Sequence, residues 1–139
     1  MSEVNVSITI ERPIEDVWSL LGGFDLLPRW LDVIASSSLS DGGRMRHLTT
    51  AAGAIIVEHL QTFDEAAKTY SYALLEGPSP VINYVGTMSA RADGKGATVA
   101  SWSSIFDVHG ADEAKTIGHF EALYRTGLER LKVVVESKD

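Results

Sequence analysis

The stretch that decides the fold is residues 112–136, which read DEAKTIGHFEALYRTGLERLKVVVE. Apolar residues recur there every three or four positions and charged residues occupy the other side, which is typical of an amphipathic helix. The apolar stripe comprises Ile117, Phe120, Leu123, Tyr124, Gly127, Leu128, Leu131 and Val134. A helix of about 24 residues is about 36 Å long, so it can cross a small sheet from end to end.

Between residues 32 and 109 the sequence predicts an antiparallel meander. Apolar or alternating runs are separated there by turns rich in glycine, proline and aspartate. The expected strands are Val33–Leu39, Arg44–Thr50, Ala54–Asp64, Thr69–Glu76, Val81–Arg91 and Ala97–Val108. Connections this short cannot make parallel crossovers, so neighbouring strands should run antiparallel.

The N-terminal part supplies one more strand and two short helices. Residues 4–10 alternate apolar and polar side chains, which predicts a half-buried strand. Pro13 suits the start of a helix that ends at Gly22-Gly23, and Asp25–Leu31 predicts a second short helix. We therefore expect a single α+β domain over residues 1–139. About seven strands should form a curved antiparallel sheet around the long C-terminal helix.

Composition excludes several classes of function. The formal net charge is −7 and there is no cysteine, which argues against nucleic acid, anionic membrane, disulfides and cysteine metal sites. The four histidines lack metal-ligand spacing, so neither a metal nor another cofactor is expected. No apolar run approaches the length of a membrane span. A cytoplasmic monomer or homodimer is expected.

Short motifs along nearly the whole chain carry a family resemblance. They are Arg12-Pro13 with Val17-Trp18, Phe24-Asp25, Pro28-Arg29-Trp30, Glu76-Gly77-Pro78 with Pro80-Val81, Tyr84 and Trp102. In these the chain resembles the START/polyketide-cyclase (SRPBCC) superfamily, and most of all its bacterial polyketide cyclase/dehydrase and lipid transport group. The resemblance implies the helix-grip fold of the birch-pollen allergens, with an apolar ligand cavity between sheet and helix.

A more distant likeness is to the plant abscisic-acid receptors, at Phe24-Asp25, Glu58 and Asn83-Tyr84. The turns at residues 50–54 and 77–80 lack the gate and latch sequences of those receptors. Leu31 stands where they have a carboxylate-binding lysine. The resemblance therefore does not extend to binding that hormone.

Strand parity predicts the cavity wall if Tyr84 faces inward, as the resemblance implies. The predicted ligand-binding residues are Leu31, Ile56, Glu58, Leu60, Tyr72, Leu74, Tyr84, Met88, Trp102, Ser104, Phe106, His119, Leu123 and Gly127. The same parity turns Ile82, Met45 and His47 inward. Most of these side chains are apolar or aromatic with a few polar groups, which is typical of a small-molecule site.

Three functions stay open at this point. The favoured one is binding, and with it transport or sequestration, of a hydrophobic small molecule such as a lipid. The second is a polyketide cyclase or dehydrase that uses Glu58, His47 or His119 as acid and base. The third is a ligand-responsive regulatory or adaptor module. A buried Glu58 needs compensation, so it either orients a ligand or pairs with Arg46 or His47.

Overall fold

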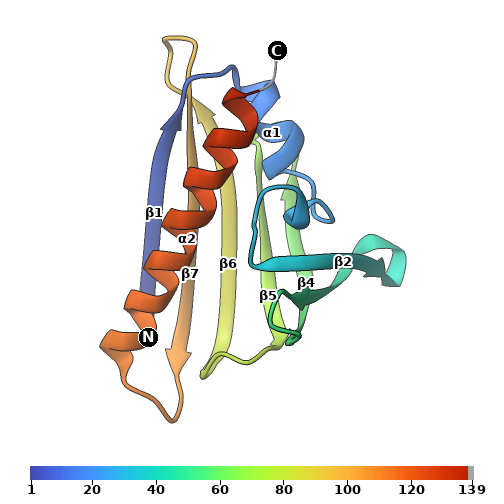
Figure 1. Cartoon of the computed structure of the whole chain (residues 1–139), viewed down its shortest axis with the longest axis vertical. Coiled ribbons are helices and arrows are strands. Elements are labelled where there is room, and N and C mark those ends of the chain that lie inside the picture. The colour runs from blue at the N-terminus through green and yellow to red at the C-terminus, as the bar shows by residue number, and fades with distance from the viewer. Residues whose placement is uncertain (138–139) are drawn as a thin grey trace.

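Seven antiparallel strands form a curved sheet that wraps around the long helix α2, Glu113–Glu136 (Figure 1). The structure is a computed structural model that describes residues 1–137, so the last two residues of the expected domain lie outside the described residues. The strands are β1 (Ser2–Ile10), β2 (Ile34–Ser40), β3 (Met45–Thr50), β4 (Ile55–Asp64), β5 (Thr69–Glu76), β6 (Val81–Ala92) and β7 (Thr98–Val108). The remaining elements are helix α1 (Ile14–Leu21) and the 3₁₀ turns η1 (Leu27–Arg29) and η2 (Asp41–Gly43). This is the predicted helix-grip fold.

The strand order in the sheet is β1-β7-β6-β5-β4-β3-β2, and all pairs are antiparallel. The predicted meander is confirmed, because β2 to β6 each pair with the next strand along the chain. The first strand returns to the last, with Ser2 opposite Phe106 and Ile10 opposite Thr98. In Figure 1, β2 runs across the direction of β6 and β7, which shows how strongly the sheet twists.

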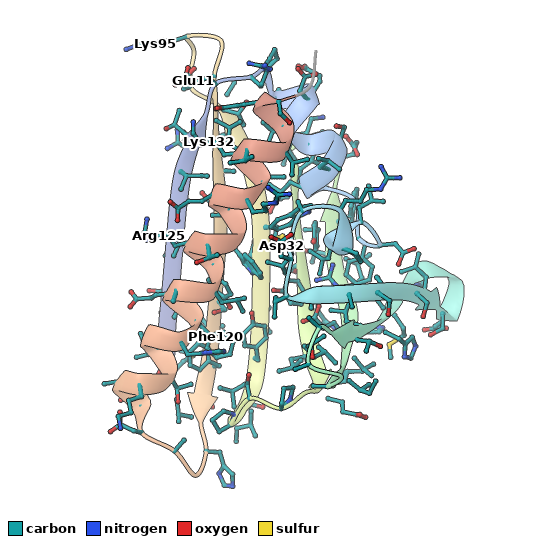
Figure 2. The ribbon with its side chains drawn as sticks, viewed as in Figure 1. Glu11, Asp32, Lys95, Phe120, Arg125 and Lys132 are labelled. Atoms are coloured by element: carbon teal, nitrogen blue, oxygen red, sulfur yellow. The ribbon has the colours of Figure 1, made fainter. Side chains whose placement is uncertain are left out.

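Helix α2 is capped at its N-terminus by Asp112, whose carboxylate accepts the backbone N–H of Lys115 at 2.8 Å. Its buried face comprises Thr116, Phe120, Tyr124, Gly127, Leu128, Leu131 and Val135. The helix packs chiefly on β1 and β7. At its far end, the Glu136 carboxylate accepts the backbone N–H of Glu11 at 2.8 Å and the Lys132 ammonium at 2.6 Å. Glu11 and Lys132 accordingly lie at the same end of the molecule in Figure 2.

The second expected helix, Asp25–Leu31, is only the 3₁₀ turn η1. Pro28 lies inside this segment and has no N–H to donate. The turn closes instead through i to i+3 bonds, from the Arg29 N–H to the Leu26 carbonyl and from the Trp30 N–H to the Leu27 carbonyl. This tight turn brings Leu27 and Trp30 into the core, where both are fully buried.

The expected inward direction of Met45 and His47 is wrong. In β3 the buried side chains are those of Arg46 and Leu48. The register explains this, because Arg46 lies directly opposite Glu58 on β4 and paired residues share one face of a sheet. His47 points to the outer face, is exposed, and contacts the Ser40 hydroxyl at 2.7 Å through Nε2.

Ile82 also faces outward, with half of its surface exposed, although Tyr84 two residues later is buried. The β6–β7 register shifts between Ile82 and Val85, which marks a β-bulge. Asn83, inside the bulge, has a φ of 56°, in the left-handed region. The extra residue therefore reverses the parity, and strict alternation fails at this point.

Candidate functional site

A cavity of about 400 Å³ lies between the inner face of the sheet and α2. Its size is that of a small-molecule site, and its wall is overwhelmingly apolar. Strands β2 to β7, the loop between α1 and β2, the turns before β4 and β6, and α2 all contribute to it. The lining residues are Leu27, Leu31, Val33, Ile34, Arg46, Leu48, Thr50, Ala52, Ala54, Ile56, Glu58, Tyr72, Leu74, Gly77, Pro78, Ser79, Tyr84, Trp102, His119, Phe120 and Leu123.

The position of α2 explains why this space stays hollow. A Cβ atom at Gly127 would lie 2.8 Å from Cδ1 of Leu31 and 3.1 Å from the Trp102 ring, so glycine lets the helix approach closely there. The Trp102 ring stacks on Tyr124, with ring centroids 4.2 Å apart. These large side chains fill the space under the middle of α2. The cavity opens beside the N-terminal half of the helix, which contributes Phe120, labelled in Figure 2.

Most of the predicted ligand-binding residues line the cavity. They are Leu31, Ile56, Glu58, Tyr72, Leu74, Tyr84, Trp102, His119 and Leu123. Their side chains come from four strands, one loop and one helix, so only the fold brings them together. Their contacts with a ligand stay a prediction.

The other predicted residues lie outside the cavity wall: Leu60, Met88, Ser104, Phe106 and Gly127. They face inward, but they pack into the core and do not border the cavity. Met88 Sδ accepts the Tyr70 hydroxyl at 3.3 Å, and Phe106 packs on Phe120 with ring centroids 5.0 Å apart. Parity identifies the inner face of a strand, but it does not distinguish a packed side chain from one that borders a space.

Several lining residues were missed by the sequence interpretation. The wrong parity assigned to β3 left Arg46, Leu48 and Thr50 out of the predicted cavity wall. Leu27 and Val33 come from the connection between α1 and β2, and Ile34 is the first residue of β2, a strand to which no inward face was assigned from the sequence. Arg46 was named from the sequence as a possible partner of a buried Glu58, and that pair is confirmed, although Arg46 was not predicted to line the cavity.

The Arg46–Glu58 ion pair is the charged feature of the wall. Glu58 Oε1 accepts Nε of Arg46 at 2.7 Å and lies 2.7 Å from Nη2. Nη1 of Arg46 donates to the Phe24 carbonyl at 2.9 Å and to the Tyr70 hydroxyl at 3.3 Å. The rings of Phe24 and Tyr72 cover the guanidinium, with centroids 4.2 and 4.8 Å from its central carbon.

The two partners differ in how much they present to the cavity. The Arg46 side chain is 1% exposed, whereas the Glu58 side chain is 11% exposed. Among residues 1–137, nothing donates a hydrogen bond to the second carboxylate oxygen of Glu58, Oε2. Burial raises the pKa of Glu58, and the charge and hydrogen bond of Arg46 oppose that rise. The wall thus carries one unsatisfied acceptor beside a neutralised pair.

A chain of hydrogen bonds joins the aromatic residues of the wall to the core. The Trp102 indole N–H donates to the Tyr72 hydroxyl at 2.9 Å, and the Tyr124 hydroxyl donates to Ser104 at 2.8 Å. Tyr84 bridges them, 3.2 Å from the Tyr72 hydroxyl and in close contact with that of Tyr124. Burial raises the pKa of Tyr72 and of Tyr84 well above that of an ordinary phenol, so both stay protonated.

A family model described as polyketide cyclase / dehydrase and lipid transport matches residues 1–136. This chain belongs to that polyketide cyclase/dehydrase and lipid transport family. A search of the curated proteins found no match.

Solved structures share the fold of this chain. A Bacillus thuringiensis protein of unknown function is 32% identical, with a TM-score of 0.94, over 98% of this chain and all of that one. The protein XoxI from Bacillus cereus is 33% identical, with a TM-score of 0.95, over 99% of this chain and 97% of that one. A START superfamily protein from Mycobacterium smegmatis has 14% identity and a TM-score of 0.80, over 96% of this chain and 97% of that one, which shows a shared fold.

The mouth of this family member's cavity lies between two turns and α2. Ala52 from the turn before β4, Pro78 from the turn before β6, and His119 on α2 are exposed and line the cavity. Gly53 has a φ of 91°, a conformation that glycine adopts readily, so the first turn needs it. Pro78 and Pro80 stiffen the second turn. His119 therefore lies at the mouth and not deep in the cavity.

Neither a metal cluster nor a membrane-spanning helix is found in the described part of the chain. Residues 1–137 contain no group of three or more acidic or histidine side chains that could hold a metal ion. No helix among them is both long and apolar enough to cross a membrane.

Proposed function

We propose that this protein reversibly binds a hydrophobic small molecule in the cavity between the sheet and α2, as a carrier or a sequestering protein. The observation that supports this is the hollow itself, about 400 Å³ with an apolar wall in a sheet whose remaining inner face is close-packed. Moving apolar ligand surface from water into such a wall is favourable by about 25 cal/mol for each Å² buried. The family description, which includes lipid transport, supports the same proposal.

Filling the cavity should weaken this binding. Ile56 lines the cavity, and an indole in its place would occupy the volume that a ligand needs. We expect Ile56→Trp to weaken the binding of a fluorescent apolar probe at least tenfold, about 1.4 kcal/mol. The probe is titrated into the purified chain and its emission followed.

The neighbouring residue provides a matched control. Ile55 lies on the outer face of the same strand and is half exposed, so Ile55→Trp should bind the probe like the unmodified chain. Native mass spectrometry of the purified protein would report a co-purified ligand and the oligomeric state together. If the unmodified chain binds no apolar probe and carries no ligand, the proposal fails.

A second function, acid–base catalysis on a polyketide-type substrate, is favoured by one observation. Glu58 is a buried carboxyl with a raised pKa that lines the cavity, and its Oε2 accepts no hydrogen bond from the described residues, as suits a general acid or base. His47 cannot take that role, because it lies on the outer face of the sheet.

Glu58→Gln separates the two functions. Glutamine keeps the size and an oxygen for Arg46, but it cannot transfer a proton at neutral pH. If the protein is an enzyme, turnover of a polyketide-type substrate should fall by about 100-fold or more. If it is a carrier, no turnover is found in either protein. Binding of the apolar probe should survive in the variant in both cases.

A further inference from the structure

Two phenols of the cavity wall, Tyr72 and Tyr84, have their hydroxyl protons committed to other residues. Tyr124 gives its one hydroxyl proton to Ser104, so Tyr84 must be the donor in its contact with Tyr124. The Tyr84 proton is then used, so Tyr72 must donate to Tyr84 across 3.2 Å. Tyr72 itself accepts the indole N–H of Trp102. Both wall phenols are therefore left with lone pairs and no free proton.

The protons of the ion pair are likewise committed to other residues. Arg46 directs its N–H groups to Glu58, the Phe24 carbonyl and Tyr70, and with 1% of its side chain exposed it offers almost no surface to a ligand. Glu58 uses Oε1 for Arg46, and Oε2 has no hydrogen-bond donor among the described residues. An acceptor in an apolar wall is costly while it stays unpaired.

From this polarity we propose that the ligand is a neutral apolar molecule that carries a hydroxyl group, and that this hydroxyl donates to Glu58 Oε2. The inference rests on the proposed binding function and narrows its ligand class. A carboxylate would bring a second negative charge beside Glu58 and no proton to donate. An ether of the same size would fill the volume but leave Oε2 unpaired.

Three probes of matched chain length test this on the unmodified full chain at about pH 8. Decanol and methyl nonyl ether are isomers that differ in having a hydroxyl donor, and decanoate carries the charge. Each is used to displace a fluorescent apolar probe. A hydrogen bond to a charged acceptor corresponds to about a 10- to 100-fold gain in affinity, so decanol should compete at least tenfold more strongly than the ether. Decanoate should compete more weakly than decanol.

A double variant gives the second measurement. Arg46→Met with Glu58→Leu replaces the ion pair by apolar groups of similar size, so decanol and the ether should compete equally there. Equal competition by the two isomers in the unmodified chain, or stronger competition by decanoate, would overturn the hydroxyl assignment while leaving the proposed binding function intact. Absence of binding by every apolar probe would instead remove the binding function itself.

Discussion

Replacing Arg46 by methionine is expected to lower the free energy of unfolding by about 3–5 kcal/mol, because it leaves the buried Glu58 without its partner. Both groups are taken out of water by the core and by the covering rings of Phe24 and Tyr72. The variant also loses the bonds from the guanidinium to the Phe24 carbonyl and to Tyr70. Urea unfolding at neutral pH, followed by tryptophan fluorescence, measures the difference.

The loss of stability in Arg46→Met should depend on pH in a definite direction. The pKa of Glu58 is raised by burial in the folded protein, so the folded state binds a proton that the unfolded chain has already released. The stability that this proton contributes is present at low pH and is lost as the pH rises through the raised pKa. Without Arg46 the pKa rises further. The deficit of Arg46→Met should therefore be smaller at about pH 5 than at about pH 8.

The control for this prediction is the double variant Arg46→Met with Glu58→Leu, which removes both charges. It should recover most of the lost stability, because an apolar pair of similar volume replaces an ion pair at little net cost. If the double variant is no more stable than Arg46→Met alone, the cause is lost packing around the guanidinium and not an unpaired charge.

The second large loss of stability is expected from a substitution at Gly86 on β6. A Cβ atom added there would overlap Cζ and the hydroxyl of Tyr72, which belong to a rigid ring held by Trp102 and Tyr84. Gly86→Ala should lower the free energy of unfolding by about 3 kcal/mol, from overpacking and the loss of one or two hydrogen bonds. It should also weaken probe binding, because the displaced ring is part of the cavity wall.

Gly118 on α2 provides the opposite case. It is exposed, and a Cβ atom there would meet nothing within 4 Å. Gly118→Ala should therefore stabilise the protein by up to about 1 kcal/mol, through the better helix propensity of alanine. The same urea unfolding measurement serves for both variants. Destabilisation of similar size in both would show that the space around Tyr72 is not what limits Gly86.

The fold could be predicted from the sequence because its main elements have clear periods. The apolar stripe from Phe120 to Leu131 required a helix, and the turns between residues 32 and 109 required short antiparallel connections. The direction of β3 could not be predicted in this way. Met45 and His47 alternate with Arg46 and Leu48, and each set joins one apolar residue to one that can carry charge. Only the register that places Arg46 opposite Glu58 decides between them.

The candidate site was harder to predict than the fold, for two physical reasons. A β-bulge such as the one at Asn83 adds a single residue and so reverses which side chains face inward. The sequence of Val81–Met88 contains no pattern that predicts this bulge. A cavity is the space left when neighbouring side chains fail to fill a volume, so it depends on distances between elements. Leu60 and Ile56 lie on the same strand, yet only Ile56 borders the hollow.

The pairing of β1 with β7 has a consequence for how the chain folds. Residues about 100 positions apart, such as Ser2 and Phe106, must meet before the first strand gains its hydrogen-bonded neighbour. Until then Val4, Val6 and Ile10 have no covered surface to join, because the helix that packs on this strand is formed by still later residues. Contacts between residues so far apart in the sequence slow folding, and they prolong the lifetime of aggregation-prone intermediates. Although β1 is synthesised first, it would thus be the last strand to pair with a neighbour.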